Sequence, residues 1–167
     1  MGKAKKDKDI KTNAMRMLDS KHISYTVNTY DCEDFIDGVH IARMLGQSED
    51  MSYKTLVTKG KSGGYFVFVL PVAKELDMKK AAKSVGEKSV EMVHVKDINT
   101  VTGYIRGGCS PLGMKKQFPT VVDESARELD TIIISGGRLG SQILLAPDDL
   151  VKACAGSFGD IVFKEDM

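Results

Sequence analysis

The segment GYIRGGCSP, residues 103–111, carries the most suggestive chemistry of the chain, a single cysteine inside a glycine-rich turn. A cysteine becomes a nucleophile when a nearby histidine or a helix N-terminus lowers the pKa of its thiol. The sequence places no histidine close to Cys109. Paired glycines, in contrast, let the backbone approach a ligand and direct amide N–H groups at an anion. We therefore expect Gly107 and Gly108, rather than the Cys109 thiol, to act in this loop.

Two further turns and one lysine complete the set of candidate features. The turns are KSGGY at 61–65 and SGGRLG at 135–140, and Lys54 precedes Thr55 at the start of a β-rich segment. Each turn also suits an ordinary tight connection, and a lysine at a strand start is often an exposed edge charge. The residue types alone leave both interpretations open.

Several familiar motifs do not fit in detail. The run GKS at 60–62 resembles the end of a phosphate-binding P-loop, but position 55 is Thr where that motif has Gly. A β-rich run also follows it, where the P-loop requires a helix. The glycines of SGGRLG do not match the GxGxxG spacing of dinucleotide-binding proteins. A Ser-His-Asp triad stays open at this stage, because its members come together only in space.

Histidines and cysteines give no pattern of metal ligands. The three histidines are isolated, at positions 22, 40 and 94, and we expect each to be structural or on the surface. The three cysteines, at positions 32, 109 and 154, are widely spaced and odd in number. This usage argues against a disulfide framework or a metal site and favours a reducing cytoplasm.

The length of the chain indicates a single domain, and its net charge is too small to indicate nucleic-acid binding by itself. A chain of 167 residues with a net charge of +1 suits one globular domain, here expected at 11–167. It contains no apolar run long enough to cross a membrane and no secretory signal. Lysines crowd residues 3–11, and we expect residues 1–10 to form a basic flexible tail. Two smaller basic groups lie at 79–88 and at 106–116. Each basic group suits either solvated surface or a broken surface for phosphates.

Hydrophobic periodicity and turn residues predict a mixture of short helices and strands. Helices are expected at 12–21, 39–46, 76–85, 95–103 and 146–156, with a helical turn at 125–130. Strands are expected at 23–30, 55–60, 65–71, 90–95, 119–123, 131–135 and 141–146, those at 55–60 and 65–71 forming a hairpin. The elements do not alternate as regular βαβ units. The order predicts an α+β fold with a mixed, barrel-like sheet flanked by helices.

Four segments together resemble a known family. They are KTLV at 54–57, the run from 66 to 92, TGYIRGGCSPLGMKK at 102–116 and SGGRLG…LAPDDL within 135–150. In this order they resemble the YbaK family of free-standing aminoacyl-tRNA editing domains, which is similar to the insertion domain of bacterial prolyl-tRNA synthetases. The resemblance covers about residues 11–163. It implies a cytosolic deacylase of Cys-tRNA(Pro), with possible action on Cys-tRNA(Cys), and neither metal nor organic cofactor.

The resemblance also implies site residues. Lys54 corresponds to the key polar residue of the family, and Gly107 and Gly108 join it as the catalytic set. The substrate-binding set comprises Tyr30, Thr55, Ser110, Ser135, Gly136 and Gln142. Two positions depart from the family pattern. Where the family has an aromatic residue, this chain offers either Phe35 or Asp37, and the polar pocket residue of the family falls near Gln142. The amino-acid preference therefore stays open between cysteine and alanine.

The chemistry of editing suits this residue set. Cysteine and proline are so close in size that a hydrophobic pocket separates them by only about 1–3 kcal/mol, so a second, hydrolytic site supplies the missing discrimination. An activated ester requires a held carbonyl, donors for the developing oxyanion and a nucleophile. The resemblance implies that the substrate thiol attacks its own carbonyl, with water as the competing nucleophile. Prolyl-tRNA synthetase is the expected partner, and a non-catalytic tRNA- or synthetase-binding module is the alternative.

Overall fold

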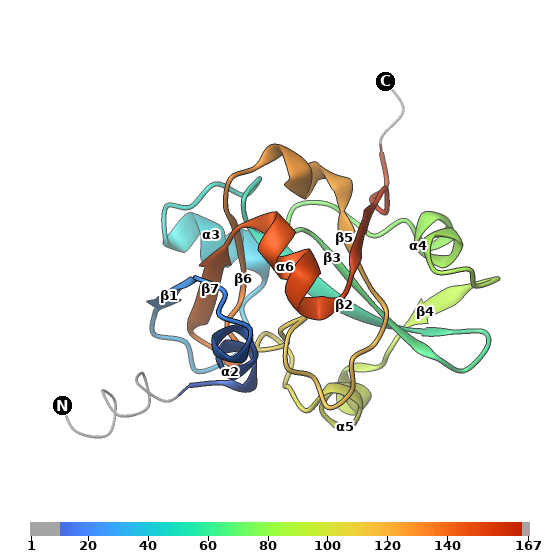
Figure 1. The fold of residues 1–167 in the computed structure, drawn as a ribbon, viewed down its shortest axis with the longest axis horizontal. Helices are drawn as coiled ribbons and strands as arrows, with labels where there is room; N and C mark the ends of the chain where they lie inside the picture. The colour runs from blue at the N-terminus through green and yellow to red at the C-terminus, as the bar shows by residue number, and fades with distance from the viewer. Residues whose placement is uncertain (1–10, 165–167) are drawn as a thin grey trace.

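Eight strands form two β-sheets in residues 11–164, the part of the chain that the computed structural model describes (Figure 1). The expected basic tail at 1–10 lies outside the described residues. The three-stranded sheet is antiparallel and has the order β1 (Thr26–Thr29), β7 (Ser141–Leu145), β6 (Ile132–Ser135). The five-stranded sheet has the order β4 (Val90–Met92), β2 (Tyr53–Gly60), β3 (Tyr65–Pro71), β5 (Thr120–Asp123), β8 (Ser157–Gly159).

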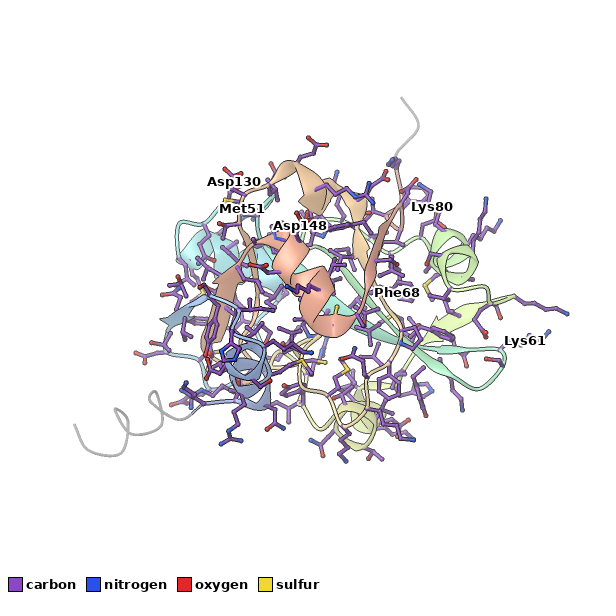
Figure 2. The ribbon with its side chains drawn as sticks, in the orientation of Figure 1. Met51, Lys61, Phe68, Lys80, Asp130 and Asp148 are labelled. Atoms are coloured by element: carbon purple, nitrogen blue, oxygen red, sulfur yellow. The ribbon has the colours of Figure 1, made fainter. Side chains whose placement is uncertain are left out.

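The five-stranded sheet is mixed, as the sequence predicts. Strands β4, β2 and β3 pair antiparallel, whereas β5 and β8 extend the sheet in parallel. The β2–β3 hairpin is confirmed, and Gly63 in its turn has a φ of 96°. Strand β3 is buried on both faces, which explains its continuous apolar run; the side chain of Phe68 is fully buried inside it (Figure 2).

The two sheets meet at the beginning of β2. Ser52 forms a parallel bridge with Ile133, and the Ile133 amide donates to the Met51 carbonyl at 2.9 Å. From Thr58 onward the same edge of β2 pairs with β4 instead. The α+β class is therefore confirmed, but the strands make two sheets joined at one short contact and do not close into a barrel. This junction positions the site described below.

Short helices surround the sheets, and polar N-caps begin most of them. These are α2 (Asn13–Ser20), α3 (Gly38–Met44), α4 (Met78–Ser84), α5 (Ile98–Thr102) and α6 (Pro147–Cys154), with 3-10 turns η1 (Val95–Asp97) and η2 (Glu124–Glu128). Asp77 caps α4 by accepting from two amides, as expected, and Asp37 caps α3 by accepting from the His40 amide at 3.0 Å. Gly103 ends α5 in the left-handed region, also as expected.

Helices α2 and α6 cover one main core and α4 covers a second. The larger core packs Leu18 and Leu150 against strands of both sheets. The smaller core packs Ala81 against Phe68 and Ile161. No helix within residues 11–164 is both long and apolar enough to span a bilayer.

Candidate functional site

A pocket of about 460 Å³ opens at the junction of the two sheets. Strand β2 and the residue before it contribute a continuous stretch of its wall, from Ser52 to Val57, and strand β6 contributes Ile133 to Ser135. Apolar side chains from other elements complete most of the wall: Ile41, Val72, Val93 and Ile98. The pocket is thus a mainly apolar cleft with a few polar groups, as is usual for small-ligand sites.

Lys54 lies in this wall, so the sequence interpretation of a purely exposed edge charge does not describe it. The residue is half-buried in β2, opposite Leu70 of β3. Its Nζ lies 3.4 Å from the Val72 carbonyl oxygen. Burial lowers the pKa of Lys54, while the carboxylates of Glu75 and Asp37 partly oppose this shift. Within residues 11–164 its ammonium forms no salt bridge, which leaves it available to an anionic ligand.

The glycine-rich loop enters the pocket at Gly107 and Cys109, whereas Gly108 does not line it. The Gly108 amide donates to the Ile105 carbonyl at 2.9 Å and so closes the turn. The amides of Gly107 and Cys109 have no protein acceptor among the described residues. Gly107 has a φ of 84°, and a Cβ at this position would lie 2.8 Å from a methyl carbon of Leu139. The available donors are therefore those of residues 107 and 109.

Ser110 and Gly136 support the pocket from behind. Ser110 is fully buried outside the wall, and its hydroxyl accepts from the Leu112 amide at 3.2 Å. Gly136 is likewise absent from the wall. Its amide donates to the Ser141 carbonyl at 2.8 Å, and its carbonyl accepts from Thr12 at 2.5 Å. Both residues hold local structure, so their expected substrate contact would have to be indirect.

Tyr30, Thr55, Ser135 and Gln142 do line the pocket. Burial raises the pKa of Tyr30, so its phenol stays protonated. The Ser135 hydroxyl accepts from the Gly137 amide at 3.2 Å. The Gln142 amide exchanges two hydrogen bonds with Gln47, at 2.8 and 3.1 Å, and also accepts from Asn28 at 3.0 Å. Gln142 therefore ties the segment after α3 to β1 and β7, and most of its hydrogen-bonding capacity is used within the protein.

Two hydroxyl groups in the wall have no partner in the described part of the chain. They are Thr55 Oγ1 and Ser141 Oγ, both inaccessible to solvent. Buried polar groups are nearly always hydrogen-bonded, so each exception calls for an explanation. Sequence reasoning found Thr55 through the family resemblance but missed Ser141, because a serine that begins a strand after a glycine-rich turn gives no distinctive signal.

The pocket mouth carries charges that the sequence interpretation placed only loosely. Asp37 is the one carboxylate among the wall residues, and its Oδ2 lies 2.5 Å from His40 Nδ1. Hydrogen bonds from His40 lower the pKa of Asp37. The Arg106 guanidinium lies 3.8 Å from the centre of the exposed Phe35 ring. Phe35 and Asp37, the two alternatives for one family position, therefore both reach the pocket.

Cys109 is a poor nucleophile in this setting. The residue is 9% exposed, packs with Val57 and Tyr104, and burial raises the pKa of its thiol to about 11. The three histidines are exposed, and none of them lines the pocket. In residues 11–164 no cluster of three or more His, Cys, Asp or Glu side chains is arranged to bind a metal ion. The polar residues that line the pocket thus include a lysine, an arginine, one aspartate, one glutamine and several hydroxyl-bearing residues.

Comparison with known proteins agrees with this geometry. Residues 37–153 match the family model described as the aminoacyl-tRNA editing domain. A protein of Enterococcus faecalis, which carries the provisional name Cys-tRNA(Pro)/Cys-tRNA(Cys) deacylase EbsC, is 47% identical over 163 residues, covering 97% of this chain and 99% of that protein.

Solved structures share the fold at low sequence identity. A hypothetical protein, APE2540, has a TM-score of 0.83 and 22% identity, with 91% of this chain and all of that chain covered. A structure described provisionally as a trans-editing enzyme for prolyl tRNA synthetase has a TM-score of 0.77 and 20% identity, with 93% and 100% covered. These two structures support the fold alone. The family model and the 47% identical relative show that the chain belongs to the aminoacyl-tRNA editing domain family.

Proposed function

We propose that this protein deacylates mischarged Cys-tRNA(Pro), and Cys-tRNA(Cys) as a second substrate, in the pocket at the junction of the two sheets. The observation that carries the proposal is that Lys54 and the free amides of Gly107 and Cys109 border one pocket in a chain of the editing family. The name of the 47% identical relative supports the choice of cysteine. The volume of the pocket suits an aminoacyl group together with part of a nucleoside.

Lys54 is the group that we assign to the 3′-terminal nucleotide. A half-buried ammonium without a salt-bridge partner within residues 11–164 attracts a phosphate or a ribose oxygen. Arg106 at the mouth adds a second positive charge, stacked on Phe35. In this arrangement Lys54 orients the terminal adenosine and is not a general base.

The amides of Gly107 and Cys109 are the donors that we assign to the ester carbonyl. Backbone N–H groups fixed in a turn stabilise an oxyanion without reorganising during the reaction. Gly107 lets the chain come close, because its φ of 84° and its contact with Leu139 exclude a side chain. This modifies the sequence hypothesis, because the Gly108 amide is already bonded to Ile105.

The substrate thiol is the nucleophile in the proposed reaction. Its sulfur forms a bond to the carbonyl carbon, and the ester bond from that carbon to the ribose oxygen breaks. The proton lost by the thiol is balanced by the proton taken up by the ribose hydroxyl. The cyclic thioester that leaves is then hydrolysed by water to free cysteine. The scheme asks the protein only for positioning and electrostatic stabilisation.

A panel of mischarged tRNAs tests the proposal. Purified protein is assayed for deacylation of Cys-tRNA(Pro), Cys-tRNA(Cys), Ser-tRNA(Pro) and Ala-tRNA(Pro). We expect the cysteinyl substrates to react fastest and the seryl substrate far more slowly, because a hydroxyl is the poorer nucleophile. Equal cysteinyl and seryl rates would favour water as the nucleophile. Preferred cleavage of Ala-tRNA(Pro) would make alanine, in place of cysteine, the amino acid that the protein removes. No cleavage of any substrate would favour a non-catalytic binding module.

Substitution of Lys54 tests the assignment of the site. Lys54→Ala should reduce deacylation at least a hundredfold while the circular dichroism spectrum and melting temperature stay close to wild type. Removing a half-buried charge without a salt-bridge partner in the described chain does not destabilise the fold strongly. A variant that deacylates at the wild-type rate would show that the site lies elsewhere.

Prolyl-tRNA synthetase is the partner that we propose for delivery of the substrate. A net charge of +1 gives the chain little general attraction for tRNA. Association with the synthetase would raise the local concentration of freshly mischarged tRNA. Co-sedimentation of the two proteins with and without tRNA(Pro) measures this directly, and the absence of a complex under both conditions would contradict it.

A further inference from the structure

Arg106 is the exposed cation at the mouth of the pocket. Two basic residues line the wall, and Lys54 is half-buried whereas Arg106 is exposed. Within residues 11–164 the Arg106 guanidinium has neither a salt bridge nor a hydrogen-bond acceptor, whereas Arg43, outside the pocket, donates to Glu49 at 2.9 Å. The N–H donors of Arg106 are therefore open to solvent or to a ligand.

The ring of Phe35 supports this guanidinium. The central carbon of the guanidinium lies 3.8 Å from the centre of the ring, close enough for the flat face of the group to rest on the ring. Stacking uses that face and leaves the N–H groups around the edge free. Donors held in one plane can bind a phosphate through two parallel hydrogen bonds, which the point charge of a lysine does not provide.

Phe35 is itself packed against the glycine-rich loop. A Cβ at Gly107 would lie 3.1 Å from Phe35 Cδ2 and 3.9 Å from Phe35 Cα. The lack of a side chain at position 107 therefore lets Phe35 rest on the loop. The guanidinium, the ring and the Gly107 residue form one packed unit, and the exposure of Phe35 and Arg106 marks the open side of the pocket.

Negative charges beside Phe35 restrict where an anion can bind. The segment from residue 31 to the start of α3 carries four exposed carboxylates, those of Asp31, Glu33, Asp34 and Asp37. In the described part of the chain none of them lies within salt-bridge distance of Arg106. Because these carboxylates repel a polyanion, a phosphate near this segment is favoured only where it meets the guanidinium. The arrangement suits one phosphate and not a long stretch of nucleic-acid backbone.

The order of groups along the loop matches the order of groups in the substrate. The proposed reaction places the ester at the Gly107 amide, and Arg106 is the adjacent residue, with its side chain at the mouth. In an aminoacylated tRNA one ribose separates the ester from the phosphate that precedes the terminal adenosine. Because the rest of the tRNA extends out of the pocket, that phosphate lies nearer the mouth than the ester does.

We propose that Arg106, oriented by Phe35, binds the phosphate that links the terminal adenosine to the preceding nucleotide. This inference rests on the proposed deacylase function. Arg106 is then a positioning residue, and Lys54 is left to the ribose and the ester. Because the phosphate does not change during the reaction, the contact is equally strong in substrate and transition state and therefore lowers KM without raising kcat.

Two non-hydrolysable analogues that differ by one phosphate test the inference without relying on turnover. Both are 3′-amino-3′-deoxyadenosine acylated with cysteine through an amide, and one also carries a 5′-methylphosphate, which has the single charge of the natural linkage. Calorimetric titration into the full chain should show about five- to tenfold tighter binding of the phosphate-bearing analogue, the effect of one charge-assisted contact at an exposed site. Arg106→Gln should remove this preference and leave the affinity for the other analogue unchanged.

Two further variants separate the phosphate contact from general charge. Phe35→Leu keeps the guanidinium but removes its support, so the preference should fall about two- to fivefold, the usual effect of an exposed cation–π contact. Arg127→Gln is the matched control, because Arg127 also lies over an aromatic ring, that of Phe158 at 4.9 Å, but does not line the pocket. It removes the same charge and should leave the preference intact.

Deacylation of Cys-tRNA(Pro) provides the kinetic readout, in which Arg106→Gln should raise KM and leave kcat unchanged. The inference is overturned by equal binding of the two analogues to wild type, by an equal loss for both in Arg106→Gln, or by an unchanged preference in Phe35→Leu. A preference lost in Arg127→Gln, or a lower kcat at constant KM in Arg106→Gln, would also overturn it. A phosphate preference that requires Arg106, in a wild-type protein that does not deacylate Cys-tRNA, would overturn the proposed function and leave the phosphate contact standing.

Discussion

At the scale of single residues, Cys109 and Gly107 both line the pocket but differ in what they can contribute to a reaction. With a pKa of about 11, the Cys109 thiol is almost fully protonated near neutral pH, so thiolate is scarce. Gly107 contributes a free amide and a backbone conformation that side chains rarely adopt.

Substitutions at these two positions should therefore have opposite outcomes. Cys109→Ala should keep deacylation within about threefold of wild type, because the thiol takes no part in the reaction. Gly107→Val should reduce kcat/KM at least a hundredfold, because a side chain there meets Leu139 and displaces the amide. Gly63→Val, at another left-handed glycine in the distant hairpin turn, controls for backbone strain alone. An inactive but folded Cys109→Ala variant would restore the thiol as a candidate nucleophile.

The environment of Lys54 leads to a prediction of pH dependence. Burial lowers the pKa of Lys54, and the nearby Glu75 carboxylate favours the charged form. Glu75→Gln removes that support, so the Lys54 pKa should fall further and the alkaline limb of the deacylation profile should move to lower pH. The rate is measured against pH after subtraction of uncatalysed ester hydrolysis. Glu91→Gln, an exposed carboxylate on β4, is the matched control. An unchanged limb in Glu75→Gln would mean that the limb does not report the loss of the Lys54 proton.

Residue types predicted part of the site, and burial determined the rest. Lys54, Thr55 and Gly107 were reachable from the sequence because they lie in recognisable segments. The absence of a partner for Ser141 is a property of three-dimensional packing, which one sequence does not record. The same holds for Gln142, whose amide is committed to Gln47, a residue distant in sequence.

At the scale of elements, two glycine-rich turns form the frame of the pocket by packing on each other. A Cβ at Gly108 would lie 2.8 Å from the Arg138 Cα, so residues 107–109 rest directly on the turn that joins β6 to β7. The short distance explains the paired glycines in backbone terms. Gly107 lines the pocket, and Gly108 allows contact between the turns.

Gly108→Ala should therefore separate the two turns. We expect a loss of about 1–3 kcal/mol in the free energy of unfolding, the usual cost of overpacking, together with reduced deacylation. Gly64→Ala is the control, since a Cβ there meets only ordinary contacts at 3.6 Å. Chemical denaturation of both variants measures the effect. A Gly108→Ala variant as stable as wild type would show that the turns are not in firm contact.

Elements with strong local signals were predictable, and those that depend on distant partners were not. The Asp77 cap, the Gly103 helix end and the β2–β3 hairpin follow from adjacent residues. Strand β8, three residues with little apolar character, exists because it pairs in parallel with β5. The expected barrel likewise gave way to two sheets, because β2 exchanges one neighbour for another along its length.

At the scale of the whole molecule, the described lysines differ in their position and in their ion pairs. Lys61 lies at the tip of the β2–β3 hairpin, on the side of the molecule opposite β1 (Figures 1 and 2). Lys80 Nζ forms a salt bridge with Asp160 Oδ2 at 3.1 Å, and Lys11 forms one with Asp19. Some of these lysines therefore belong to ion pairs.

The lysines of residues 1–10 are further candidates for contact with the tRNA backbone. Deleting residues 1–10 should weaken tRNA binding and flatten its dependence on salt, since each lost phosphate contact lowers the slope of log K against log salt by up to about 0.9. Replacing Lys3, Lys5, Lys6 and Lys8 with Gln keeps the length and removes only charge, so the two variants should behave alike. Filter binding of tRNA(Pro) across a salt series measures the slope. A slope equal to wild type in both variants would assign the tail to solvated surface, and delivery by the synthetase would then have to supply the affinity that the chain lacks.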